Sequence, residues 1–197
     1  MKKSIVATAT ALACLIPLAA QAQNQEGPWM VRTRAVHLNS ANKDSTPLDL
    51  SINDKWLPEV DISYFFSPNW AAELVLTVPQ KQTVSAGGTA IGSLRHLPPS
   101  LMLQYHQDMG GFKPYVGAGL NYTRFSSVRL PTGVSIDKNS VGGALQLGVD
   151  IPLQKGLYLN LDVKKVFIKT EVSAAGAALG TLKVDPVLLG VGLGWRF

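Results

Sequence analysis

The sequence contains a single cysteine, Cys14, which lies inside an N-terminal apolar run. If that run is removed on secretion, the remaining chain can form no disulfide and supports no thiol chemistry. The preceding Ala11-Leu12-Ala13 is a poor match to a lipoprotein signal, so we do not expect Cys14 to carry a lipid. The stability of the protein must therefore come from packing and hydrogen bonds.

Long apolar runs are also missing after the N-terminal region. Two lysines precede an apolar stretch that ends in Ala20-Gln21-Ala22, a small-residue cleavage site. These features predict a secretory signal peptide at residues 1–22. No later segment supplies the ~20 apolar residues that a transmembrane helix needs. We therefore expect residues 23–197 to form one domain without a helical anchor.

The chain has no concentration of positive charge. Its formal net charge is +5, and loss of the two lysines of the signal peptide lowers this value to +3. The basic residues are scattered through the sequence, whereas a nucleic-acid-binding surface requires a basic patch or stripe. We therefore expect no nucleic-acid partner.

Catalytic and metal-binding motifs are absent from the sequence. His37, Asp44 and Ser45 come nearest to a catalytic triad, but their spacing matches no hydrolase motif. His96 and His106 would lie at opposite ends of one predicted strand, too far apart to share a metal ion. We expect no enzymatic activity, no cofactor and no metal.

The C-terminal stretch, KVDPVLLGVGLGWRF (183–197), alternates strictly from Val187 onward. Large apolar residues occupy every second position up to Phe197, and mostly glycines stand between them. One oily face and one small-residue face are typical of a wall with lipid outside and a crowded interior. A half-buried strand of a soluble sandwich is the alternative. The terminal aromatic resembles the signal that the barrel-assembly machinery reads, so we expect Phe197 to engage that machinery.

Seven further segments alternate in the same way, with aromatic residues near their ends. The eight predicted strands cover residues 29–38, 56–66, 70–78, 97–107, 112–125, 139–151, 157–164 and 183–197. Their connections alternate between long (39–55, 79–96, 126–138, 171–181) and short (67–69, 108–111, 152–156). Long extracellular loops and short periplasmic turns are typical of outer-membrane barrels. A soluble lipocalin-like barrel would have polar outward faces, and these are apolar. The sequence predicts an all-β, eight-stranded antiparallel up-and-down transmembrane β-barrel in a bacterial outer membrane.

Several stretches, in order, resemble the OmpW family of outer-membrane proteins. They are GPWMVRTRAVHLN (27–39), INDKWLPEVDISYFFSPNWAAELVLT (52–77), HLPPSLMLQYH (96–106), FKPYVGAGLNYTRFSS (112–127), YLNLDVKKVFIKTEV (158–172) and the C-terminal stretch. The resemblance implies an eight-stranded barrel whose narrow, largely apolar channel passes small hydrophobic molecules. Residues 79–95 and 173–181 contribute little to it.

The inward positions of the predicted strands carry charges of both signs. They form a predicted polar plug of Arg32, Arg34, Lys164, Arg196, Glu59, Asp61, Glu73 and Asp162. An eight-stranded barrel is just wide enough for side chains to fill it, and an unpaired buried charge costs several kcal/mol. We therefore expect these groups to pair, either as a permanent polar core or as a gate.

The predicted extracellular loops are rich in apolar residues, which indicates a binding funnel or strands that extend beyond the membrane and pack together. We expect Leu50, Ile52, Leu97 and Met102 to line a ligand path. Prolines at 58, 79, 98 and 99 remove backbone donors, which predicts a weak place between the second and fourth strands.

The predicted function is passive uptake of small hydrophobic solutes through this funnel, with lateral exit into the membrane as one route. A structural barrel or a surface receptor for phage or bacteriocins is the alternative. The expected lipid partners are outer-membrane lipid and lipopolysaccharide.

Overall fold

The computed structural model describes residues 26–197, so the predicted signal peptide lies outside the described residues. Eight strands form the main wall of the molecule. They are β1 (Trp29–Asn39), β4 (Lys55–Phe65), β5 (Trp70–Thr77), β8 (Ser100–His106), β9 (Lys113–Arg129), β11 (Asn139–Gln154), β12 (Leu157–Val166) and β15 (Val187–Arg196). Within residues 26–197, none of the structure is a helix that could span a membrane.

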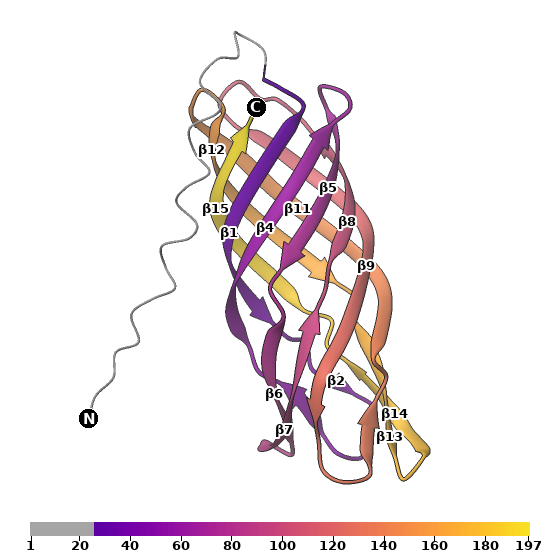
Figure 1. The fold of residues 1–197 in the computed structure, drawn as a ribbon. Coiled ribbons are helices and arrows are strands. Elements are labelled where there is room, and N and C mark those ends of the chain that lie inside the picture. The colour runs from indigo at the N-terminus through magenta and orange to yellow at the C-terminus, as the bar shows by residue number, and fades with distance from the viewer. Residues whose placement is uncertain (1–25) are drawn as a thin grey trace, which may run out of the picture.

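These eight strands form a closed barrel (Figure 1). Each strand pairs antiparallel with its neighbours in chain order, and β1 pairs with β15 to join the two ends of the chain. Closure leaves no free strand edge in the membrane, where unpaired backbone groups are costly. The predicted eight-stranded up-and-down barrel is confirmed.

Side chains alternate between the two faces of the wall as the sequence predicts. Outward residues such as Leu101, Leu120 and Val141 are apolar and exposed, whereas inward residues are polar, charged or glycine over much of the wall and apolar toward the end that carries the long connections. Gly148 shows why glycine is needed inside, because a Cβ there would lie 2.3 Å from the ring of Tyr115. The narrow bore is filled by a few large inward side chains that glycines accommodate.

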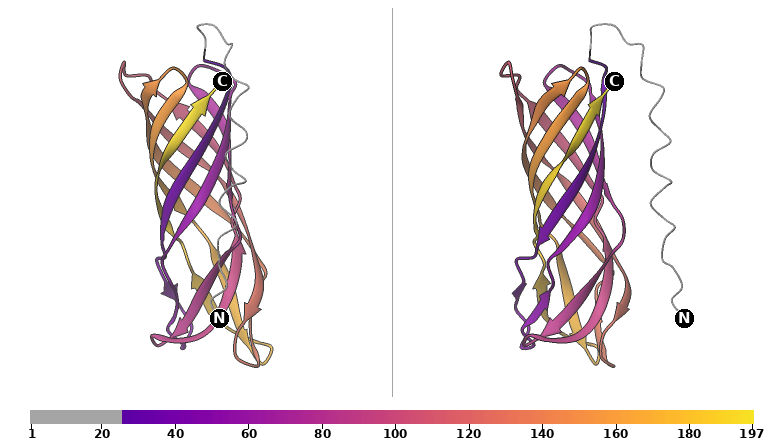
Figure 2. Two further views of the ribbon diagram at one scale, coloured as in Figure 1. Left: turned by 60° about the vertical axis from the view of Figure 1, so that its left-hand side comes forward. Right: turned by 90° about the vertical axis from the view of Figure 1, so that its left-hand side faces the viewer.

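The four long connections contain strands, so of the two arrangements left open by the sequence the structure has strands that extend beyond the membrane. Beyond the membrane-spanning part, the barrel wall continues as short β-structure at the end opposite the C-terminus (Figures 1 and 2). The additional strands are β2 (Lys43–Asp44), β3 (Leu50–Ile52), β6 (Gln80–Ala86), β7 (Thr89–Leu97), β10 (Val134–Ile136), β13 (Lys169–Ala174) and β14 (Ala177–Lys183). Strands β3, β6 and β7 join the sheet at β9, and β10, β13, β14 and β2 form a second sheet.

Candidate functional site

An apolar cluster fills the interior of the end that carries the long connections, which is extracellular in outer-membrane barrels. The cluster consists of Val36, Leu38, Leu50, Ile52, Leu57, Val75, Val84, Leu94, Met102, Phe125, Ala144, Val166, Ile168, Val172, Leu182, Val184 and Leu188. Partly buried apolar residues, including Leu48, Ile91 and Leu130, pack against it. Of the two interpretations left open for the apolar residues of the long connections, the structure shows the packed one, in which they form a core inside the extended barrel.

Two polar side chains of the first long connection hold β3 in this cluster. The Asn42 amide accepts a hydrogen bond from the backbone N–H of Ile52 at 2.8 Å and donates one to the Ile52 carbonyl at 3.0 Å. The Asp44 carboxylate accepts from the backbone N–H of Leu50 at 2.6 Å. Burial alone would raise the pKa of Asp44, but hydrogen bonds from Thr46 and Leu50 lower it. The carboxylate therefore stays ionised and fixes Leu50 and Ile52 facing inward.

An ionic network crosses the lumen on the periplasmic side of the apolar cluster. It consists of Arg32, Arg34, Lys164, Glu59, Asp61, Glu73, Asp150 and Asp162. The Arg32 guanidinium lies 3.0 Å from Glu73 and 2.7 Å from Asp150. These side chains are almost fully removed from solvent, and several ion pairs join strands that are not neighbours in the wall, such as β1 and β11. The network therefore closes the bore.

The remaining contacts of the network join its two halves. Arg34 pairs with Asp61 and lies 3.0 Å from Glu59, and the Lys164 ammonium lies 2.7 Å from the same Glu59 oxygen. The Tyr115 hydroxyl donates to Asp162 at 2.7 Å. Because each charged group here has an opposite charge or a hydrogen-bond partner, the desolvation penalty is largely offset.

The composition of the network differs from the predicted plug at two positions. Arg196 lies at the periplasmic mouth, where its guanidinium is 3.1 Å from Glu26 rather than among the plug carboxylates. Asp150 takes a place in the network that the prediction omitted. Its inward position on β11 could have identified it, since Gln146 points inward on the same strand. The other seven predicted residues lie together.

A small cavity of about 20 Å³ lies between the apolar cluster and the ionic network. Its lining combines residues of both, including Leu38, Val75, Thr77, Pro98 and Lys164. The Thr77 hydroxyl is buried and has no hydrogen-bond partner among the described residues. The apolar interior therefore ends at a polar boundary with space for about one water molecule.

The backbone ladder is interrupted beside this cavity. Strands β5 and β8 pair as far as Val75 and Ser100, and their continuations β6 and β7 resume pairing at Gln80 and His96. Residues 76–79 and 97–99 do not pair with each other, and we call this interruption the ladder break. It lies in the wall immediately outside the cavity, which Thr77 and Pro98 both line.

Prolines account for the ladder break. Pro79, Pro98 and Pro99 lack the N–H that a continuous ladder would use. The Asn121 side chain donates to the carbonyls of Pro98 and Pro99, each at 3.1 Å, and the Tyr122 N–H also donates to Pro99. The seam toward β9 is therefore satisfied, and only the seam between β5 and β8 is open. Pro58 lies outside the break, because β4 and β5 stay paired from Glu59 and Thr77 onward.

Three of the four residues predicted to line a ligand path lie in the apolar cluster, and the fourth lies in the wall beside it. Leu50 and Ile52 lie within the apolar cluster at exposures of 4% and 2%, and Met102 lies deeper in the same cluster. Leu97 is half-buried in the ladder break. Three of the four therefore share one continuous apolar interior, and the fourth lies at its side.

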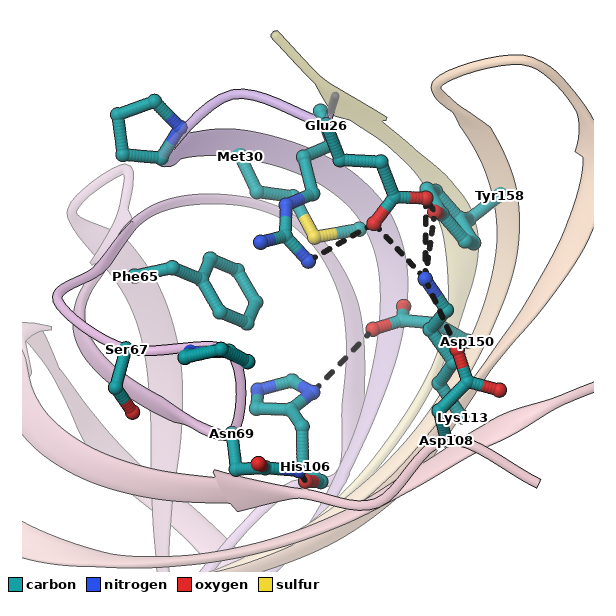
Figure 3. A pocket seen from close by; sticks show the side chains of 13 residues that line it. Glu26, Met30, Phe65, Ser67, Asn69, His106, Asp108, Lys113, Asp150 and Tyr158 are labelled. Carbon is teal, nitrogen blue, oxygen red and sulfur yellow. Dashed lines mark hydrogen bonds and ion pairs between the residues drawn. The ribbon is translucent and has the colours of Figure 1, made fainter. Parts of the chain in front are cut away.

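A wider cavity of about 640 Å³ occupies the periplasmic mouth (Figure 3). Glu26 is one of the residues that line it, and its carboxylate accepts a hydrogen bond from Tyr158 and lies 2.8 Å from the Lys113 ammonium and 3.1 Å from Arg196. Burial alone would raise the pKa of Glu26, but hydrogen bonds from Lys113 and Tyr158 and the nearby positive charges lower it. This mouth is polar, in contrast to the extracellular interior.

The structure separates the residues that come nearest to a triad in the sequence. The His37 ring packs against Trp56 with ring centroids 4.9 Å apart, and the Asp44 carboxylate binds Thr46 and Leu50. The Ser45 hydroxyl donates to the Thr181 carbonyl. Within residues 26–197 no group of histidine, cysteine and acidic side chains has the geometry of a metal site.

Comparisons with known proteins agree with this architecture. The OmpW family model matches residues 25–197. An uncharacterized outer-membrane protein of Sinorhizobium fredii, y4mB, is 43% identical over 86% of this chain and 80% of its own length. The dibenzothiophene metabolism operon protein PahQ of Pseudomonas aeruginosa is 27% identical over 93% of this chain and 95% of its own. The crystal structure of OprG from Pseudomonas aeruginosa superposes with a TM-score of 0.75 at 26% identity, covering 90% of this chain and 99% of that one.

A closed barrel with an apolar outer band, aromatic residues at both rims and a filled lumen defines a small bacterial outer-membrane barrel protein, whose outer face contacts membrane lipid. Trp29 and Tyr64 form part of one aromatic rim, and Trp56 and Tyr122 part of the other. Within that class, the chain belongs to the OmpW family.

Proposed function

We propose that the protein carries small hydrophobic molecules passively across the outer leaflet and releases them sideways into the membrane. The observation that carries this proposal is the sequence of environments along the axis. An apolar interior ends on a closed ionic network, and the wall beside that boundary is interrupted. The proposal assigns transport, and no chemical step, to the chain.

The entrance is the apolar cluster, which is closed in the structure. A hydrophobic solute that displaces these side chains exchanges one apolar contact for another, so its entry has little desolvation cost. The half-buried rim residues, including Leu48, Ile91 and Leu130, are the first surface such a solute meets. PahQ is named for a dibenzothiophene metabolism operon, and dibenzothiophene is a small, flat, apolar compound of this kind.

The ionic network makes the axial route unfavourable. A solute moving further along the axis would have to separate Arg32 and Arg34 from their carboxylates, and separating buried charges costs several kcal/mol. The ladder break offers an exit in which no backbone hydrogen bond between β5 and β8 has to be broken. Its outward neighbours Leu76 and Val78 are apolar and exposed. The lateral exit is therefore the route of lower cost.

The entrance is tested by uptake of dibenzothiophene into cells that depend on this protein. Leu50→Asp combined with Ile52→Asp places two carboxylates in the apolar cluster and should abolish uptake. Ser51→Asp adds a carboxylate on the opposite face of β3 and should leave uptake near the wild-type rate. Unchanged uptake in the double aspartate variant would rule out the apolar entrance.

The folding of each variant is checked in the same cells. Barrel formation is followed by heat-modifiable migration on gels, and only folded variants enter the comparison. Ile52→Ala provides a second test because it loosens the cluster but keeps it apolar. We expect Ile52→Ala to retain or increase uptake, and a complete loss of uptake in this folded variant would contradict an apolar entrance.

A further inference from the structure

Outward-facing basic residues surround the extracellular extension of the barrel. They come from six different strands and are exposed to solvent. This basic belt consists of Lys43 on β2, Lys81 on β6, Arg95 on β7, Arg124 on β9, Lys169 on β13 and Lys183 on β14. The proposed uptake function makes no use of them.

The strand register places like charges directly opposite one another. Lys81 pairs with Arg95 across β6 and β7. Lys183 pairs with Lys169 on one side and with Lys43 on the other, so three lysines form a row across β13, β14 and β2. Like charges at directly opposed positions of a sheet are destabilising. An anion bound between them would convert this repulsion into attraction.

The belt lies just beyond the extracellular aromatic rim. Arg124 is the next outward residue after Tyr122 on β9. In the same way, Lys169 is the next outward residue after Phe167. Tyr122 and Phe167 are exposed at 48% and 42%. Aromatic side chains mark the membrane–water interface, so the belt lies at the depth of the lipid headgroups.

The protein supplies few acidic groups to neutralise the belt. None of its six side chains forms an ion pair within residues 26–197. Nearby carboxylates bind the backbone, since Asp54 accepts from the Ser40 N–H and Asp185 from the Ile168 N–H. Glu171 is the next outward residue after Lys169 on β13. The acid lies beyond the belt, on the side away from the membrane.

We propose that the basic belt binds the phosphate groups of lipopolysaccharide in the outer leaflet. Phosphate oxygens accept hydrogen bonds from both lysine and arginine, and a phosphate between two directly opposed cations contacts both. The lysine row and the Lys81–Arg95 pair are then two separate phosphate sites on different sides of the barrel. Binding at both would anchor the extension in the lipopolysaccharide layer.

The test measures binding of purified lipopolysaccharide to the folded barrel by native mass spectrometry and by the rise in melting temperature on addition of the lipid. Lys183→Gln removes the centre of the lysine row. We expect about fivefold weaker binding, the effect of one lost cation near an anionic membrane surface. Lys155→Gln makes the same chemical change at the periplasmic turn and should leave affinity unchanged.

Two further arms identify the ligand. Dephosphorylated lipopolysaccharide should bind the wild type and Lys183→Gln equally, and inorganic phosphate at the same phosphate concentration should not raise the melting temperature. Equal protection by inorganic phosphate would show a general anion site and overturn the assignment to lipid. Lys81→Gln with Arg95→Gln tests the second site independently.

A structural role for the lysines gives a different result. Without lipid, Lys183→Gln should raise the melting temperature of the barrel because it relieves repulsion from Lys43 and Lys169. With lipopolysaccharide, the variant should gain less than the wild type. If Lys183→Gln has the same affinity as the wild type for the phosphorylated lipid, the proposal is wrong.

Discussion

Replacing a cation of the ionic network should destabilise the barrel far more than replacing a carboxylate. The network has three buried cations, Arg32, Arg34 and Lys164, and five buried carboxylates. Each cation therefore serves more than one carboxylate. Removing a cation leaves an uncompensated buried negative charge, whereas removing a carboxylate lowers the excess of negative charge in the network.

Arg34→Met and Glu73→Gln make this comparison with side chains of similar size. Arg34 is the cation that pairs with Asp61, and the other Asp61 oxygen already lacks a hydrogen-bond partner. Breaking a buried pair by removing one partner costs about 3–5 kcal/mol. Glu73→Gln keeps an oxygen that can accept the hydrogen bond from Arg32. Arg32 also retains its ion pair with Asp150, whose oxygen lies 2.7 Å from the guanidinium. We expect Glu73→Gln to cost at most about 1 kcal/mol.

The free energy of unfolding is measured by urea titration of the barrel in lipid vesicles, followed by tryptophan fluorescence. The difference between the two variants should be at least about 2 kcal/mol. Lys138→Gln, at an exposed position outside the network and the basic belt, serves as a control for loss of one positive charge. Equal destabilisation by Arg34→Met and Glu73→Gln would refute the charge balance drawn from the network.

Three further predictions concern the bore, the orientation and the periplasmic mouth. Planar-bilayer recordings should show conductance far below that of sixteen-stranded porins, because side chains fill the bore, and large steady currents would contradict a closed network. Cysteines at Gly87 or Gly176 should be labelled on intact cells and a cysteine at Asn69 should not, and equal labelling at both ends would contradict this orientation. The pKa of Glu26 is lowered in the folded protein, so its contact with Lys113 should persist at neutral pH and be lost as the pH falls below the usual carboxyl range. Cross-linking between positions 26 and 113 would detect this loss.

The eight strands could be predicted because lipid outside and a crowded lumen inside impose a period of two on every crossing. The same rule located the network, since Arg32, Glu59 and Glu73 occupy inward positions. Strands that extend beyond the membrane were only one of two alternatives, and their bounds could not be predicted, because an inward position beyond the membrane carries no fixed polarity. Gln80 and Gln82 of β6 point inward as fully as Val84 does.

Partners from distant parts of the chain were the least predictable features. Arg196 faces the lumen by its position on β15, but the sequence gives no sign that Glu26, 170 residues earlier, lies beside it. The prolines predicted an interruption of the wall. Its position between β5 and β8 depends on Asn121, whose side chain satisfies the carbonyls on the other seam. A single sequence does not specify such pairings.

The lateral exit is tested most directly by closing the ladder break with a disulfide. Thr77→Cys and Pro98→Cys continue the register of Val75 and Ser100 across the break. The only natural cysteine lies in the predicted signal peptide, so the introduced pair has no competitor. A control disulfide joins Val163 and Leu189, which face each other across β12 and β15.

Uptake of dibenzothiophene is then compared in oxidised and reduced cells that express each folded variant. We predict that the disulfide at 77 and 98 stops uptake and that reduction restores it, whereas the control disulfide has no effect in either state. Undiminished uptake through a barrel with the break closed would show that the solute does not leave between β5 and β8.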